Sequence, residues 1–78
     1  MKRKLTVTKN RKYAVSTVKV SDGLYETAVF GIDITITPLW CPNIYDIDYY
    51  REMERFNFST KREAIKCHRI VVKYWSMM

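Results

Sequence analysis

The stretch YAVSTVKVSDGLYETAVFGI, Tyr13 to Ile32, decides the fold because it places two runs of strand-forming residues on either side of a tight turn. From Tyr13 to Val20, β-branched residues are frequent and successive side chains alternate between two faces. Ser21-Asp22-Gly23 is typical of a turn, since glycine tolerates a positive φ and aspartate can close a local hydrogen bond. The sequence therefore predicts a β-hairpin whose second strand runs from Leu24 to about Ile32.

Downstream of the hairpin, the strictly alternating run Ile32 to Thr37 also predicts a strand, with Gly31 as a candidate bulge or bend. Two prolines follow, so residues 38–46 are expected to form an irregular loop. Residues 46–54 fit either a short helical turn or the approach to a strand, and that choice stays open. The run Met53 to Phe58 predicts the last strand.

A helix is predicted over residues 60–75. Thr60 and Glu63 have the spacing of a capping box, with Glu63 expected to reach back to the cap amide. One continuous apolar stripe follows, made of Ala64, Ile65, His68, Val71, Val72 and Trp75. The expected fold is α+β: a single domain, 1–78, in which an antiparallel three- to four-stranded β-meander packs against one C-terminal α-helix. Residues 1–12 are expected to form a basic N-terminal arm, and one sheet face is expected to lie uncovered.

The charge pattern is compatible with nucleic acid, an anionic surface or an acidic protein as partner, and equally with a solvated basic face. Lysine and arginine outnumber aspartate and glutamate by 14 to 8, which gives a net charge of +6 over 78 residues. The cations gather at both ends of the chain, and acids gather between them. No apolar run is long enough to predict a membrane span, and the basic start is not followed by the apolar core of a signal peptide, so a cytoplasmic protein with no membrane partner is expected.

Two surfaces are candidate binding sites. The first is the solvent-facing side of the predicted helix together with the N-terminal arm, where cations could neutralise phosphates. The second is the apolar, proline-stiffened loop, which could anchor an interface or fold back onto the sheet. Sheet aromatics such as Tyr13, Tyr25 and Phe30 could stack on bases but equally fill a thin core. The candidate partner-binding or nucleic-acid-binding residues are Lys61, Arg62, Lys66, Arg69, Lys73, Arg11, Lys12, Trp40 and Tyr45.

The lone histidine, His68, falls within the apolar stripe and is expected to be a core residue with one ring nitrogen hydrogen-bonded. A transition-metal site with Cys41, Cys67 and Asp46 or Asp48 is the alternative, but adjacent positions on a helix point about 100° apart and no second ligand pair has the usual spacing. The cysteines are expected to be free thiols. Glycine-rich phosphate loops and the common hydrolase motifs are absent, so neither an enzyme nor a cofactor is expected.

Three segments resemble small accessory proteins of bacteriophages and prophages. They are Val15-Ser16-Thr17-Val18, Tyr25 to Phe30, and Phe58-Ser59-Thr60 continuing through Glu63-Ala64 to His68. Those proteins carry an STV strand, an ETMVF strand and a helix that opens T-x-E-E-A and continues to G-H. Here Ala28 replaces their methionine and Cys67 their glycine, and their aspartate-histidine pair is missing, which argues against a shared catalytic or metal role for His68.

The resemblance implies a phage accessory protein, a class that includes inhibitors of host defence such as anti-CRISPR proteins. The leading hypothesis is therefore a cytoplasmic protein of the infected cell that binds and inhibits a host protein or nucleoprotein complex. Because the candidate surfaces are basic, contact with an acidic surface or a nucleoprotein groove is expected rather than mimicry of nucleic acid. A direct DNA- or RNA-binding module and a metal-stabilised protein are the alternatives, and a homodimer through an edge strand or the open sheet face is conceivable.

Overall fold

Two long strands form the centre of the sheet. The computed structural model describes residues 3–32 and 47–78. Within these residues, β2 (Tyr13–Ser21) pairs antiparallel with β3 (Leu24–Ile32), which confirms the predicted hairpin. Gly23 at the turn has a φ of 73°, a conformation that costs glycine little and other residues more. Residues 33–37, predicted as strand after Ile32, and the predicted loop 38–46 lie outside the described residues.

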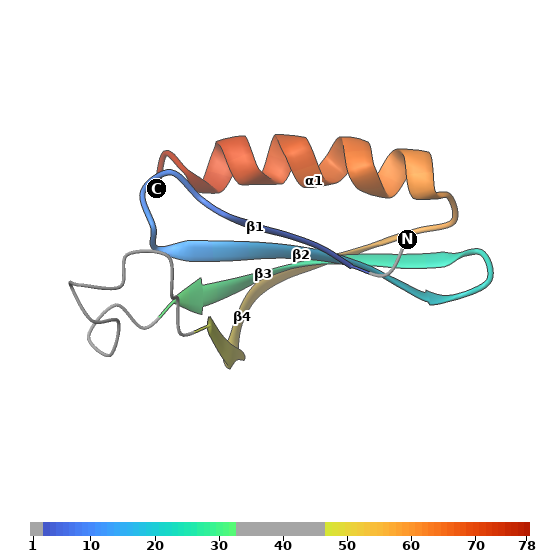
Figure 1. Ribbon diagram of the computed structural model, residues 1–78, viewed down its shortest axis with the longest axis horizontal. Helices are drawn as coiled ribbons and strands as arrows, with labels where there is room; N and C mark the ends of the chain where they lie inside the picture. Colours follow the sequence, from blue (N-terminus) through green and yellow to red (C-terminus); the bar gives the residue numbers. More distant parts are fainter. Residues whose placement is uncertain (1–2, 33–46) are drawn as a thin grey trace.

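Two further strands and a helix complete the architecture shown in Figure 1. Strand β1 (Arg3–Val7) pairs with β2, and β4 (Ile47–Phe58) pairs with β3. The strand order of the described sheet is β1-β2-β3-β4, and every pairing is antiparallel. Helix α1 (Lys61–Trp75) lies across one face of this sheet. The predicted α+β class, a meander followed by one C-terminal helix, is confirmed.

The N-terminal segment differs from the predicted basic arm, because Arg3–Val7 forms the edge strand β1. Side chains alternate along this strand, so Leu5 and Val7 lie on one face of the sheet and Thr6 lies on the other. The Thr6 hydroxyl lies 2.8 Å from Nε2 of His68 on the helix, which ties the strand to α1. Cations in such a strand do not prevent pairing, since edge strands commonly carry lysine and arginine that discourage further strand addition.

Strand β4 is longer than the predicted run from Met53, and the undecided stretch before it is also extended. Its register against β3 is regular from Phe58 back to Glu54 and then shifts on both sides of Phe30. The predicted irregularity near Gly31 is therefore present. A Cβ at Gly31 would overlap the guanidinium of Arg51, which donates a hydrogen bond of 3.3 Å to the carbonyl of Ile32. Glycine at this position leaves room for that side chain.

Helix α1 begins at Lys61 because Thr60 caps it. The Thr60 hydroxyl accepts a hydrogen bond of 3.2 Å from the Glu63 amide and donates one of 3.0 Å to the Glu63 carboxylate. The carboxylate therefore meets the cap hydroxyl rather than the cap amide predicted from the spacing. The buried side chains of the helix follow one another at intervals of four, three and four residues: Ala64, His68, Val71 and Trp75. Ile65 and Val72 are only half-buried.

The core lies between α1 and the sheet. Val15 and Val29 face each other across β2 and β3 and pack with Val71 and Trp75 of the helix. The ring of Tyr13 meets that of Trp75 edge-on, with 4.7 Å between ring centroids. Since aromatic pairs in this geometry add to the stabilisation from burial, the C-terminal turn of α1 is held firmly on the first long strand.

The sheet face turned away from α1 is not bare, in contrast to the prediction. Phe30 and Ile32 are buried there, together with Ala14 and Ala28. Tyr49 at the start of β4 packs edge-on against Phe30, with ring centroids 5.1 Å apart. This burial leaves less open surface for pairing with a second copy than the sequence alone implies.

Candidate functional site

Four cations form a row along the outer side of α1. Arg62, Lys66, Arg69 and Lys73 are spaced four, three and four residues apart, which places them on one side of the helix, and all four are exposed. We call them the cation ridge. Lys61, the fifth predicted helix cation, is also exposed at the helix start. The ridge lies opposite the buried stripe, so the packing of α1 on the sheet fixes the direction in which the ridge faces.

The charges of the ridge are not neutralised by neighbours among the described residues. The three ion pairs within residues 3–32 and 47–78 join Lys19 to Asp22 and Arg55 to Glu26 and Glu52. None includes a helix cation. From Arg62 to Lys73 the ridge spans about 16 Å, at about 1.5 Å per residue. It therefore offers a line of unshielded positive charge to an anionic partner.

A turn extends this charge beyond the end of the helix. The β1–β2 turn carries Lys9, Arg11 and Lys12, all exposed. It is attached to α1 twice: the Lys9 amide donates to the Ser76 hydroxyl at 3.1 Å, and the Asn10 side chain donates to the Trp75 carbonyl at 2.9 Å. The predicted candidates Arg11 and Lys12 are thus brought to the C-terminal end of the cation ridge.

The remaining candidate residues lie either in the core or outside the described residues. Tyr13 and Phe30, considered for base stacking, pack in the two layers of the core, and Tyr25 is half-buried. The loop candidates Trp40 and Tyr45 lie outside the described residues. The structure therefore attaches the turn that carries Arg11 and Lys12 to the C-terminal end of α1, and the loop candidates stay predictions.

His68 is buried in a chain of hydroxyl groups. Its Nδ1 lies 2.7 Å from the Thr17 hydroxyl and its Nε2 lies 2.8 Å from that of Thr6, so both ring nitrogens are bonded rather than one. Thr17 in turn shares a hydrogen bond of 2.8 Å with Thr27. Burial, with a smaller effect from the charge of Lys4, lowers the pKa of His68 from 6.5 to about 4. The ring is therefore neutral at physiological pH and serves to connect β1, β2 and α1.

The helix cysteine is no part of a metal cluster within the described ranges. Cys67 is a half-buried free thiol, and burial, followed by the charge of Glu54, raises its pKa. No group of three or more possible ligands comes together in the described part of the chain. Cys41 and Asp46, two of the predicted ligands, lie outside it.

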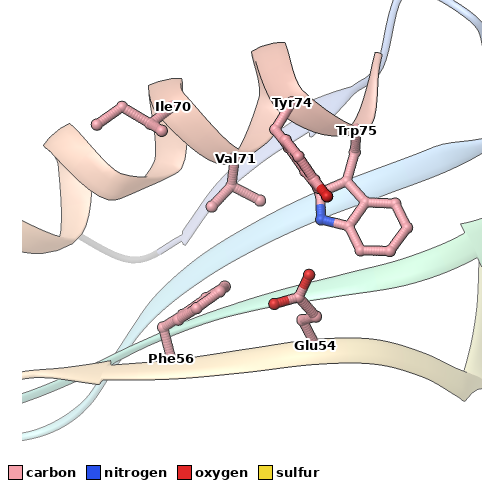
Figure 2. A pocket seen from close by; sticks show the side chains of 6 residues that line it. All are labelled: Glu54, Phe56, Ile70, Val71, Tyr74 and Trp75. Atoms are coloured by element: carbon pink, nitrogen blue, oxygen red, sulfur yellow. The ribbon is translucent and has the colours of Figure 1, made fainter. Parts of the chain in front are cut away.

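A groove between α1 and β4 was not predicted from the sequence. It has a volume of about 310 Å³, and Figure 2 shows the helix and strand side chains that face each other across it. We call it the β4 groove; its lining residues are Glu54, Phe56, Ile70, Val71, Tyr74 and Trp75. A signal was present, since Ile70 and Tyr74 are apolar helix residues outside the buried stripe, 60% and 52% exposed.

In comparisons with known proteins, no family model matches this chain, and no curated protein or solved structure is significantly similar to it. None of the described segments forms a helix with the length and apolar character needed to cross a membrane.

Proposed function

We propose that this protein acts by binding, as a phage-type accessory protein that inhibits a host defence machine in an anti-CRISPR-like manner, and that its cation ridge contacts the nucleic acid of that nucleoprotein machine. The observation that carries the proposal is the ridge itself. Arg62, Lys66, Arg69 and Lys73 are exposed, evenly spaced and free of ion pairs among the described residues. A rigid row of this kind neutralises successive phosphates.

The rest of the molecule supports a binding role. The tethered turn lengthens the ridge with Lys9, Arg11 and Lys12, so the basic surface joins two segments that are far apart in the sequence. The ring nitrogens of His68 are engaged by threonine hydroxyls, which assigns this side chain to the architecture of the fold.

The second candidate is direct binding of free DNA or RNA through the same ridge. The feature that favours it is the regular spacing of the four cations, because contacts to phosphates alone depend little on base sequence. The two candidates share a surface but differ in the partner, and one set of variants separates them.

Charge reversal tests both candidates. In the double variant Lys66→Glu, Arg69→Glu, two ridge cations become acids at exposed positions, so folding should be retained. The single variant Lys66→Glu is measured as well, and Lys19→Glu, which changes one exposed charge away from the ridge, is its matched control. We expect affinity for a labelled 20-base-pair duplex to fall roughly hundredfold between 50 and 200 mM salt if about four phosphates are contacted, and the logarithmic salt slope to drop by about two in the double variant.

Capture from host lysate at physiological salt then identifies the partner. The inhibitor proposal predicts a specific nucleoprotein that is retained by the wild type and by Lys19→Glu but lost with the double ridge variant or after nuclease treatment. Strong salt-dependent binding of the free duplex without such a complex supports the second candidate. If the double variant binds both as well as the wild type, the ridge has no part in binding and both candidates are wrong.

A further inference from the structure

The β4 groove combines an apolar floor with a strand edge that no other described strand covers. Val71 and Trp75 are 6% and 8% exposed and form its floor, while the more exposed Ile70 and Tyr74 form the rim on the helix side. On the other side lies β4, which among the described strands pairs with β3 alone. Its backbone is regular from Glu54 to Phe58, the part that borders the groove. Within the described residues, strand backbone without a partner on this side thus runs beside an apolar channel.

The groove contains one acidic side chain, that of Glu54, which would attract a positively charged group. The Glu54 side chain rises from β4 toward Trp75 and Tyr74, as Figure 2 shows. No ion pair in residues 3–32 and 47–78 includes it. Between Glu54 and Phe58, the β4 residues on this face are Glu54, Phe56 and Phe58, and none of the three is a cation. The lining of the groove therefore includes a carboxylate and no cation that would complement it.

We infer that the β4 groove binds an extended peptide that adds as a strand to the edge of β4, with apolar side chains at alternate positions and a lysine or arginine against Glu54. Recognition of this type obtains affinity from main-chain hydrogen bonds and specificity from alternate side chains that enter the channel beside the strand. The inference goes beyond the proposed function, because it assigns a partner of different chemistry to a different surface.

The charge of the groove distinguishes this occupant from others. Nucleic acid is disfavoured by the carboxylate, and the cation ridge lies on a different side of α1. A second copy paired edge to edge through β4 would bring another Glu54, a like charge, and two more phenylalanines to the same side of the sheet. A basic, apolar peptide fits both the lining and the charge.

A library of capped nine-residue peptides tests this inference. The central residue is lysine, glutamate or proline, and the other positions vary among valine, leucine, phenylalanine, threonine and serine. The protein should enrich lysine-centred peptides over glutamate-centred ones by about tenfold, as expected for a charge-assisted contact. Proline-centred peptides should be depleted because proline lacks an N–H and cannot complete a strand ladder.

Variants of the groove make the test specific. Glu54→Lys should reverse the preference between lysine- and glutamate-centred peptides, and Ile70→Glu, at a 60% exposed position, should weaken binding of every peptide without unfolding the protein. Lys19→Glu, which lies outside both the groove and the cation ridge, is the control and should leave peptide binding unchanged. For the best peptide, amide shifts in an NMR titration should concentrate in β4 and α1.

Three outcomes would overturn the inference: no enrichment, an unchanged charge preference in Glu54→Lys, or peptide-induced shifts confined to other elements. Concentration-dependent dimerisation that Ile70→Glu abolishes, together with no peptide binding, would assign the groove to a second copy instead. Because Glu54 and Ile70 lie outside the cation ridge, none of these results depends on the outcome of the duplex-binding experiment.

Discussion

Acid should destabilise this protein through a single side chain. His68 is the only histidine of the chain, and its pKa falls from 6.5 to about 4 in the folded protein. Between these values the unfolded chain binds a proton that the folded chain does not, so the free energy of unfolding decreases as the pH falls through this window. Above pH 6.5 the ring is neutral in both states and this dependence disappears. Below pH 4 both states are protonated and the loss is complete.

The magnitude follows from the two pKa values. A difference between 6.5 and about 4 corresponds to a total loss of about 3 kcal/mol, of which about 2 kcal/mol is reached at pH 5 relative to pH 8. For a domain of this size, that change lowers the midpoint of urea unfolding by about 1–2 M. The interval from pH 8 to pH 5 lies above the ordinary range of carboxylate titration, so most of the change there belongs to His68.

Urea unfolding at pH 8, 6.5 and 5 measures this dependence, and NMR titration of the imidazole measures the pKa directly. The variant His68→Gln removes the titrating ring and should flatten the profile, whatever its own stability. If that variant does not fold, the wild-type titration decides alone. A midpoint near pH 6.5 in the folded protein, or equal unfolding midpoints in urea at pH 8 and pH 5, would refute the reasoning.

Three further results are expected. Thr17→Val leaves the Thr27 hydroxyl and Nδ1 of His68 without their partner and should cost about 2–3 kcal/mol in urea unfolding, more than Thr6→Val, which removes one bond; equal costs would contradict the described chain. Thr60→Ala removes the helix cap and should cost about 1 kcal/mol, with the loss seen as a lower melting temperature. In a Cys41→Ser background, Cys67 should be alkylated more slowly at pH 8 in the folded protein than in urea, because burial raises its pKa and reduces the thiolate fraction; equal rates would argue against this.

The central hairpin could be predicted because its pattern is local. Residues 13–32 combine alternation with a turn containing Gly23, and pairing within a hairpin needs no distant partner. Helix α1 was predictable for the same reason, since its cap and its buried stripe lie in one segment. The cation ridge follows directly from that stripe, because it occupies the opposite side of the same helix.

The edge strands β1 and β4 were harder to predict than the hairpin, because their structure depends on the strands and the helix that pack against them. β1 is short and carries cations, and the contact that secures it joins Thr6 to a histidine 62 positions away. β4 has exposed residues along most of its length and two register shifts, so it shows neither strict alternation nor an apolar run. Its pairing with β3 imposes the extended backbone. The β4 groove depends on both α1 and β4 and is visible only when the two elements are placed together.

The hydrogen bonds between the β1–β2 turn and the C-terminal end of α1 also determine how the protein unfolds locally. Asn10 and Lys9 bond to Trp75 and Ser76, and Thr6 bonds to His68, so β1 and the last two turns of α1 hold each other in place. Neither segment can separate from the sheet without breaking the attachments of the other. Amide protons in β1 and in the C-terminal half of α1 should therefore exchange with solvent in one cooperative step of common free energy, although the two segments lie at opposite ends of the sequence.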